Sequence, residues 1–67
     1  MFTVDAALIR DELFKRQMTA KELAEQVGIN ALTLARLLKD GSKTQAKIIG
    51  KLAAFFGLRG DDLILKG

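Results

Sequence analysis

The side chains of this 67-residue chain that can do chemistry are lysines, arginines and carboxylates, because the sequence contains neither histidine nor cysteine. General acid–base catalysis needs a histidine or a carboxylate with a shifted pKa, and zinc sites need imidazole or thiolate ligands. The acidic pairs Asp11–Glu12 and Asp61–Asp62 cannot converge, since adjacent residues on a helix do not face each other. We therefore expect no enzymatic activity, no metal site, no cofactor and no small-molecule substrate.

The basic residues are concentrated in one part of the sequence. Residues 1–35 carry four basic and five acidic groups, and residues 52–67 carry two of each, whereas residues 36–51 have a net charge of +4. Such a segment on its own is more often a solvated surface than a binding site. It is also what a phosphate-binding surface requires. Its basic members, opposed only by Asp40, are Arg36, Lys39, Lys43, Lys47 and Lys51.

Length and composition predict one folded domain spanning residues 1–67. Apolar residues make up 49% of the chain, which is too many for a disordered segment. No apolar run approaches the roughly 20 residues that span a membrane. The first residues lack the basic region followed by a long apolar run that marks a signal peptide. We expect a cytoplasmic protein that does not bind membranes.

The elements that position the basic segment are predicted most clearly in residues 19–39. Thr19 and Glu22 have the spacing of a capping box, and Gly28 can end that helix in the left-handed conformation. Asn30 can cap a second helix that continues to the end of the stretch. Two short helices joined by a four-residue turn with a glycine are the helix-turn-helix pattern. Helical spacing predicts their buried side: Leu23, Ala24, Val27, Leu34, Leu37 and Leu38.

Two longer helices flank this pattern. Asp5 can cap a helix over residues 6–17, and Thr44 can cap one over residues 45–56. A last short turn follows at Gly60, with Leu63 directed inward. The predicted fold class is all-α, a compact bundle of about five short helices. The first flanking helix is expected to bury Ile9 and Leu13, with Ala6 and Phe14 nearby. The second is expected to bury Ala46, Ile49, Leu52, Ala53 and Phe56.

The two ends of the chain have a strand-like character. Residues 2–4 and the apolar run 63–65 could pair as a small ribbon or simply pack together. We favour packing, because isolated two-stranded ribbons are marginally stable.

The stretch from Ala20 to Lys39 resembles the DNA-binding helix-turn-helix of the phage-repressor and Cro type, the XRE-like family. Counted from Ala20, that motif places apolar residues at the fourth, eighth, tenth, fifteenth and eighteenth positions, a small residue fifth and a glycine ninth. The resemblance extends over residues 8–65 and implies a lambda-repressor-like domain. The seven motif positions are filled here by Leu23, Ala24, Val27, Gly28, Ile29, Leu34 and Leu37.

The resemblance implies sequence-specific binding of double-stranded DNA as a small transcriptional regulator or repressor. The helix of about residues 31–39 would enter the major groove. Backbone N–H groups at Ala20, where the family usually has glutamine, can still bind phosphate. The implied DNA-contacting residues are Asn30, Ala31, Leu32, Thr33, Ala35, Arg36 and Lys39 on the second helix, and Ser42, Lys43 and Thr44 after it.

These residues can make different kinds of contact with DNA. Arg36 can pair with guanine through two hydrogen bonds. Ala31 and Leu32 can touch only apolar surface, such as the methyl group of thymine. Leu32 can equally pack against the first helix of the motif or against a partner protein.

Two other functions remain open. Apolar Ala31, Leu32 and Ala35 favour a protein-interaction module with little DNA affinity, and an antitoxin-type regulator is a further alternative. We also expect a weak homodimer, since one small domain reads few base pairs. Its surface would consist of Ile48, Phe55 and Ile64, which lie off the buried stripe.

Overall fold

The structure is a computed structural model that describes residues 2–40 and 43–65. Four α-helices and a short 3-10 helix make up most of it, which agrees with the predicted helical fold. A two-stranded sheet was not predicted. In chain order the elements are β1 (Phe2–Thr3), α1 (Ala6–Arg16), α2 (Ala20–Val27), α3 (Ala31–Asp40), β2 (Lys43–Thr44), α4 (Ala46–Phe56) and η1 (Gly60–Leu63).

The helix ends follow the capping signals of the sequence. Asp5 caps α1 by accepting a hydrogen bond from the Leu8 N–H at 3.1 Å. Thr19 and Glu22 form the predicted capping box at the start of α2. Gly28 ends α2 with φ 76°, and Gly57 ends α4 with φ 71°, as glycine at a left-handed position allows.

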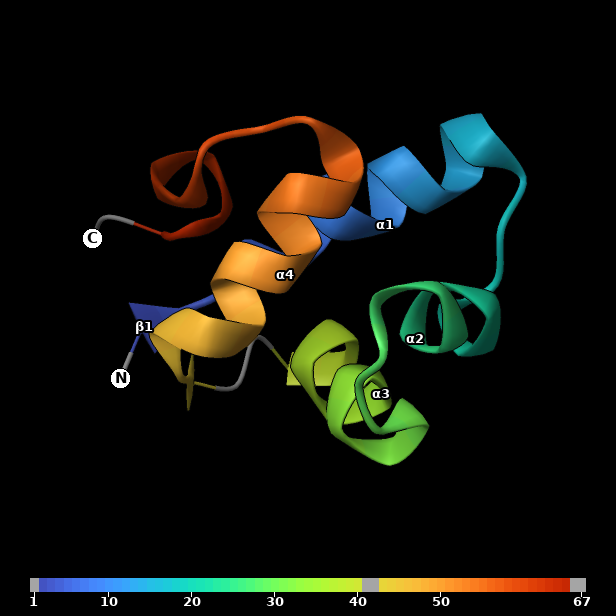
Figure 1. Cartoon of the computed structure of the whole chain (residues 1–67), viewed down its shortest axis with the longest axis horizontal. Coiled ribbons are helices and arrows are strands. Elements are labelled where there is room, and N and C mark those ends of the chain that lie inside the picture. Colours follow the sequence, from blue (N-terminus) through green and yellow to red (C-terminus); the bar gives the residue numbers. More distant parts are fainter. Residues whose placement is uncertain (1, 41–42, 66–67) are drawn as a thin grey trace.

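The helices pack around a single core. Figure 1 shows α2 and α3 side by side, with α4 crossing the middle of the view and α1 lying behind it. None of the described helices is long and apolar enough to cross a membrane. The buried core comprises Val4, Ile9, Leu13, Leu23, Ala24, Leu34, Leu37, Leu38, Ile49, Leu52, Ala53, Phe56 and Leu63.

Two residues expected in or near the core are exposed. Phe14, expected near Ile9 and Leu13, is 83% exposed, because it lies about 100° around the helix from Leu13, which takes the core position. Ala46, expected in the buried stripe, is the first residue of α4 and is exposed.

The N-terminal arm pairs with two other segments, so the preference for simple packing was wrong. Phe2 and Thr3 pair antiparallel with β2, and Val4 forms a bridge with Ile64. The Leu65 N–H donates to the Thr3 carbonyl at 2.8 Å, and the Asp5 N–H donates to the Leu63 carbonyl at 2.7 Å. The arm is therefore held from both sides and is not an isolated two-stranded ribbon.

The predicted capping role of Thr44 is also wrong. Thr44 lies in β2 opposite Phe2, and α4 begins two residues later, after Gln45. The strand pairing holds the Thr44 side chain inside the molecule, where it is 5% exposed. Thr44 therefore fixes where the chain lies just before α4 begins.

The three residues proposed for a dimer surface do not form an exposed patch. Ile48, Phe55 and Ile64 are half-buried and pack against the core. The Arg16 guanidinium lies 5.5 Å from the centre of the Phe55 ring, so α1 covers part of this aromatic side chain. The weak homodimer remains a prediction without the apolar surface on which it was based.

Gly28 and Gly50 allow the turn geometry to be tested, because a Cβ atom built at either one meets no neighbouring heavy atom within 4 Å. At the positive φ of Gly28, alanine should cost about 1–2 kcal/mol. Inside α4, alanine in place of Gly50 should gain about 1 kcal/mol. We expect urea denaturation to show a lower free energy of unfolding for Gly28→Ala and a higher one for Gly50→Ala. Shifts of the same sign would contradict the left-handed turn after α2.

Candidate nucleic-acid interface

The outward side of α3 is set by its burial pattern. Leu34, Leu37 and Leu38 face the core, and they follow one another at helical spacing. The intervening positions therefore face away from the core. The predicted contact residues of α3 that are exposed are Ala31, Leu32, Thr33, Ala35, Arg36 and Lys39.

The N-terminal end of α3 is fixed by Asn30. Its side-chain oxygen accepts hydrogen bonds from the Leu32 N–H at 2.8 Å and the Thr33 N–H at 3.2 Å. This is the N-cap arrangement that the sequence predicts. Because the oxygen is engaged with the helix, the amide NH₂ is the group of Asn30 that can donate to a base or a phosphate.

The C-terminal end of α3 is held by a residue that sequence reasoning missed. The guanidinium of Arg10, on α1, donates a hydrogen bond to the Leu38 carbonyl. Carbonyl groups in the last turn of a helix lack intrahelical partners, and a cation there also complements the helix dipole. No local signal could reveal this contact, since 28 residues separate its partners.

The capping box makes the start of α2 less favourable for a phosphate than the backbone N–H groups alone would be. The Glu22 N–H donates to the Thr19 hydroxyl at 3.1 Å, and the Thr19 N–H donates to the Glu22 carboxylate at 3.0 Å. The capping box thus engages two backbone donors and places a negative charge at this helix end. A phosphate near Ala20 would meet that carboxylate.

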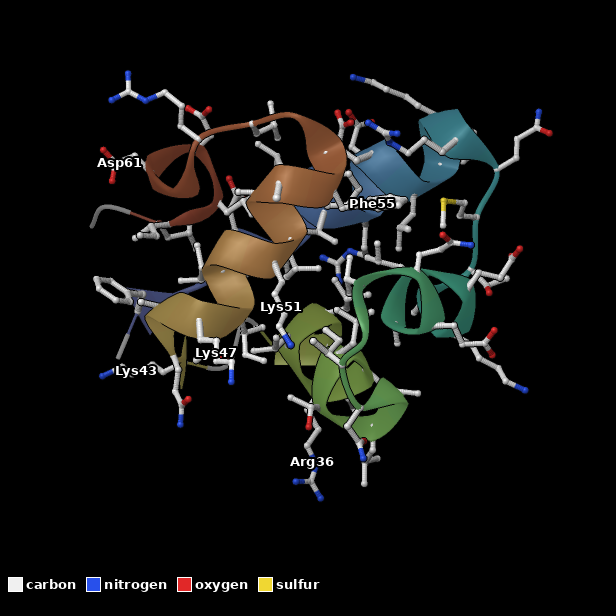
Figure 2. The ribbon with its side chains drawn as sticks, viewed as in Figure 1. Arg36, Lys43, Lys47, Lys51, Phe55 and Asp61 are labelled. Atoms are coloured by element: carbon white, nitrogen blue, oxygen red, sulfur yellow. The ribbon has the colours of Figure 1, made fainter. Side chains whose placement is uncertain are left out.

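Basic side chains from three elements gather on one side of the molecule. Figure 2 shows Lys43 of β2 at the lower left, Lys47 and Lys51 of α4 near the middle of the view and Arg36 of α3 at the bottom, whereas Asp61 lies at the upper left. All four are exposed. Lys47 and Lys51 were counted in the basic segment of the sequence but not assigned to the site. Their position there follows from the packing of α4 against α2 and η1.

The DNA-contacting residues predicted after α3 differ in their exposure to solvent. Lys43 is exposed in β2. Thr44 is buried, so its hydroxyl is not presented to a ligand. Ser42 lies outside the described residues. Gln45, the residue before α4, makes no side-chain capping hydrogen bond within the part of the chain that the structure describes.

A family comparison agrees with this arrangement. A model of the helix-turn-helix family matches residues 9–63, from within α1 to the end of η1. The chain belongs to the XRE-like helix-turn-helix family. Searches of curated proteins and of solved structures found no match. In this helix-turn-helix domain, α2, the turn at Gly28 and α3 form the motif, and the resemblance inferred from seven sequence positions is confirmed.

The role of Asn30 in fixing α3 can be tested by stability. We expect Asn30→Ala to lower the free energy of unfolding by about 1 kcal/mol, because two backbone donors lose their acceptor. Asn30→Ser supplies a hydroxyl acceptor at the same position and should stay close to the parent. Urea denaturation of both variants measures the difference. An alanine variant as stable as the parent would show that the cap does not hold α3.

Proposed function

We propose that this helix-turn-helix domain binds double-stranded DNA sequence-specifically and acts as a small transcriptional regulator. The observation that supports the proposal is the position of the exposed side of α3 together with the lysines of β2 and α4 (Figure 2). A helix flanked by cations is complementary to a groove flanked by phosphates.

In the proposed complex, α3 lies in the major groove with its first turn toward the base edges. Arg36 lies one turn further along and can reach guanine or a phosphate. Lys43, Lys47 and Lys51 contact the DNA backbone. Such contacts fix the position of the protein on the duplex but do not distinguish base pairs.

The first turn of α4 adds a second kind of backbone contact. Gln45 makes no side-chain capping bond, and Lys43 and Lys47 lie on either side of this helix start in the sequence. Backbone N–H groups at a helix N-terminus favour a phosphate. The start of α4 therefore suits DNA better than the start of α2, where Glu22 is placed.

A protein-interaction module is a second candidate, and one observation favours it. Leu32 is 60% exposed, and Ala31 and Ala35 are exposed on the same helix. An apolar helix face can dock into a groove of another protein. A folded domain that shows no salt-dependent affinity for duplex DNA would favour this candidate.

If the domain binds DNA as proposed, the effect of removing a lysine side chain on DNA affinity should depend on where that lysine lies. We expect Lys47→Ala to weaken binding to all duplex sequences and to reduce the slope of log affinity against log salt by about 0.9, the value of one phosphate contact. Fluorescence anisotropy with random duplex DNA, between about 50 and about 200 mM salt, measures this slope.

Lys15→Ala is the matched control because it removes the same charge elsewhere. Lys15 forms ion pairs with Asp11 and Glu12 near the C-terminal end of α1. That end of the helix lies far from α3 in Figure 1. Its removal should leave the slope unchanged. An equal reduction of the slope in both variants would mean that the net charge of the protein, and not the position of Lys47 near α3, determines binding.

A further inference from the structure

The outward side of α3 is divided into an apolar part and a cationic part. Residues 32, 35, 36 and 39 follow one another at helical spacing and form one stripe. The N-terminal part of the stripe carries Leu32 and Ala35, and the C-terminal part carries Arg36 and Lys39. The first turn, which reaches base edges in this docking mode, therefore presents the apolar side chains of Ala31 and Leu32 together with the polar side chain of Thr33.

We propose that Leu32 is a specificity-determining residue that reads the 5-methyl group of thymine in the major groove. The inference rests on the proposed function and goes beyond it, because it names the chemical feature that α3 selects. Its starting point is the exposure of a large apolar side chain, 60% of which is open to solvent.

The structure gives Leu32 no role in the core. The half-buried side chains that pack against the core include Val27 and Ile29 of the adjacent segment, but not Leu32. Leu32 is therefore not one of the side chains that join α3 to the core. An exposed leucine gains its hydrophobic free energy only when another molecule covers it.

The backbone at Leu32 is held in place before any ligand binds. Leu32 is the second residue of α3, and its N–H donates to the Asn30 side-chain oxygen at 2.8 Å. Its Cα position is thus set by the helix cap rather than by a mobile loop. A fixed first turn places the side chain at a definite depth in the groove.

The chemistry of the groove restricts what such a side chain can contact. In the major groove, guanine, cytosine and adenine present hydrogen-bond donors or acceptors, and thymine adds a methyl group. Leucine over a polar base edge would remove water from donors and acceptors without replacing their hydrogen bonds, which is unfavourable. Leu32 therefore favours a T·A pair by attraction to its methyl group and disfavours G·C pairs by desolvation.

The surroundings of Leu32 favour DNA over a protein as the molecule that covers it. Arg36 and Lys39 follow it on the same stripe, and Lys47 and Lys51 lie on the same side of the molecule as Arg36 in Figure 2. A protein partner would have to supply an apolar pocket bordered by several acidic groups. Duplex DNA supplies methyl groups inside a groove that phosphates border on both sides.

The experiment starts from duplexes selected by the parent domain from a random pool. Each thymine in the selected site is replaced in turn by deoxyuridine, which keeps the base pair and removes only the methyl group. We expect at least one replacement to weaken binding of the parent about fourfold, the effect of one buried methyl group. The same replacement should have almost no effect on Leu32→Ala. Alanine keeps α3 intact because it is a strong helix former.

Two further measurements separate direct contact from other causes. Phe14→Ala removes another exposed apolar side chain, on α1, and should keep both the affinity and the deoxyuridine effect of the parent. Where cytosine is placed at the sensitive position, 5-methylcytosine should bind the parent more tightly than cytosine and should not help Leu32→Ala.

The outcomes distinguish the inference from the function on which it rests. If selection yields no enriched duplex, the proposed DNA binding is wrong and the inference is wrong with it. If duplexes are enriched but no thymine methyl group matters, only the inference is overturned. An equal deoxyuridine effect in the parent and in Leu32→Ala also overturns it, because the methyl group would then act through DNA shape or another residue.

Discussion

The burial of one side of α3 is the constraint on which the candidate interface depends. Leu34, Leu37 and Leu38 can leave water only by packing against α1 and α2, and the hydrophobic free energy of that packing fixes the rotation of α3 about its axis. Once the rotation is fixed, Leu32 and Arg36 have to face outward. A change of about 100° in this rotation would replace the exposed residues with their neighbours.

The two ends of α3 are held by different interactions, and together they limit its motion. Asn30 binds the first-turn N–H groups, and Arg10 binds a carbonyl near the last turn. The first contact is local, whereas the second joins α3 to α1. A helix held at both ends loses little conformational freedom on binding, so more of its contact free energy remains as affinity.

Affinity and specificity are assigned to different parts of the proposed interface. In the proposed complex, lysines on β2 and α4 would interact with phosphates whatever the sequence, and the strength of these interactions would fall with salt. The first turn of α3 carries no charge, and its exposed leucine, Leu32, would respond to the shape and methyl groups of the groove. The pairing of β1 with β2 fixes Lys43 and Thr44 just before α4 begins.

The sequence by itself determined the features that arise from contacts between near neighbours along the chain. The capping box at Thr19, the left-handed turn at Gly28 and the cap at Asn30 each involve residues within four positions of one another, so their signals are local. Helical spacing likewise predicted most of the core and the outward side of α3. The tertiary structure decided the pairing of β1 with β2, the burial of Thr44, the contact of Arg10 with α3 and the position of the α4 lysines. Each of these depends on how distant segments pack, and neither propensity nor periodicity contains that information.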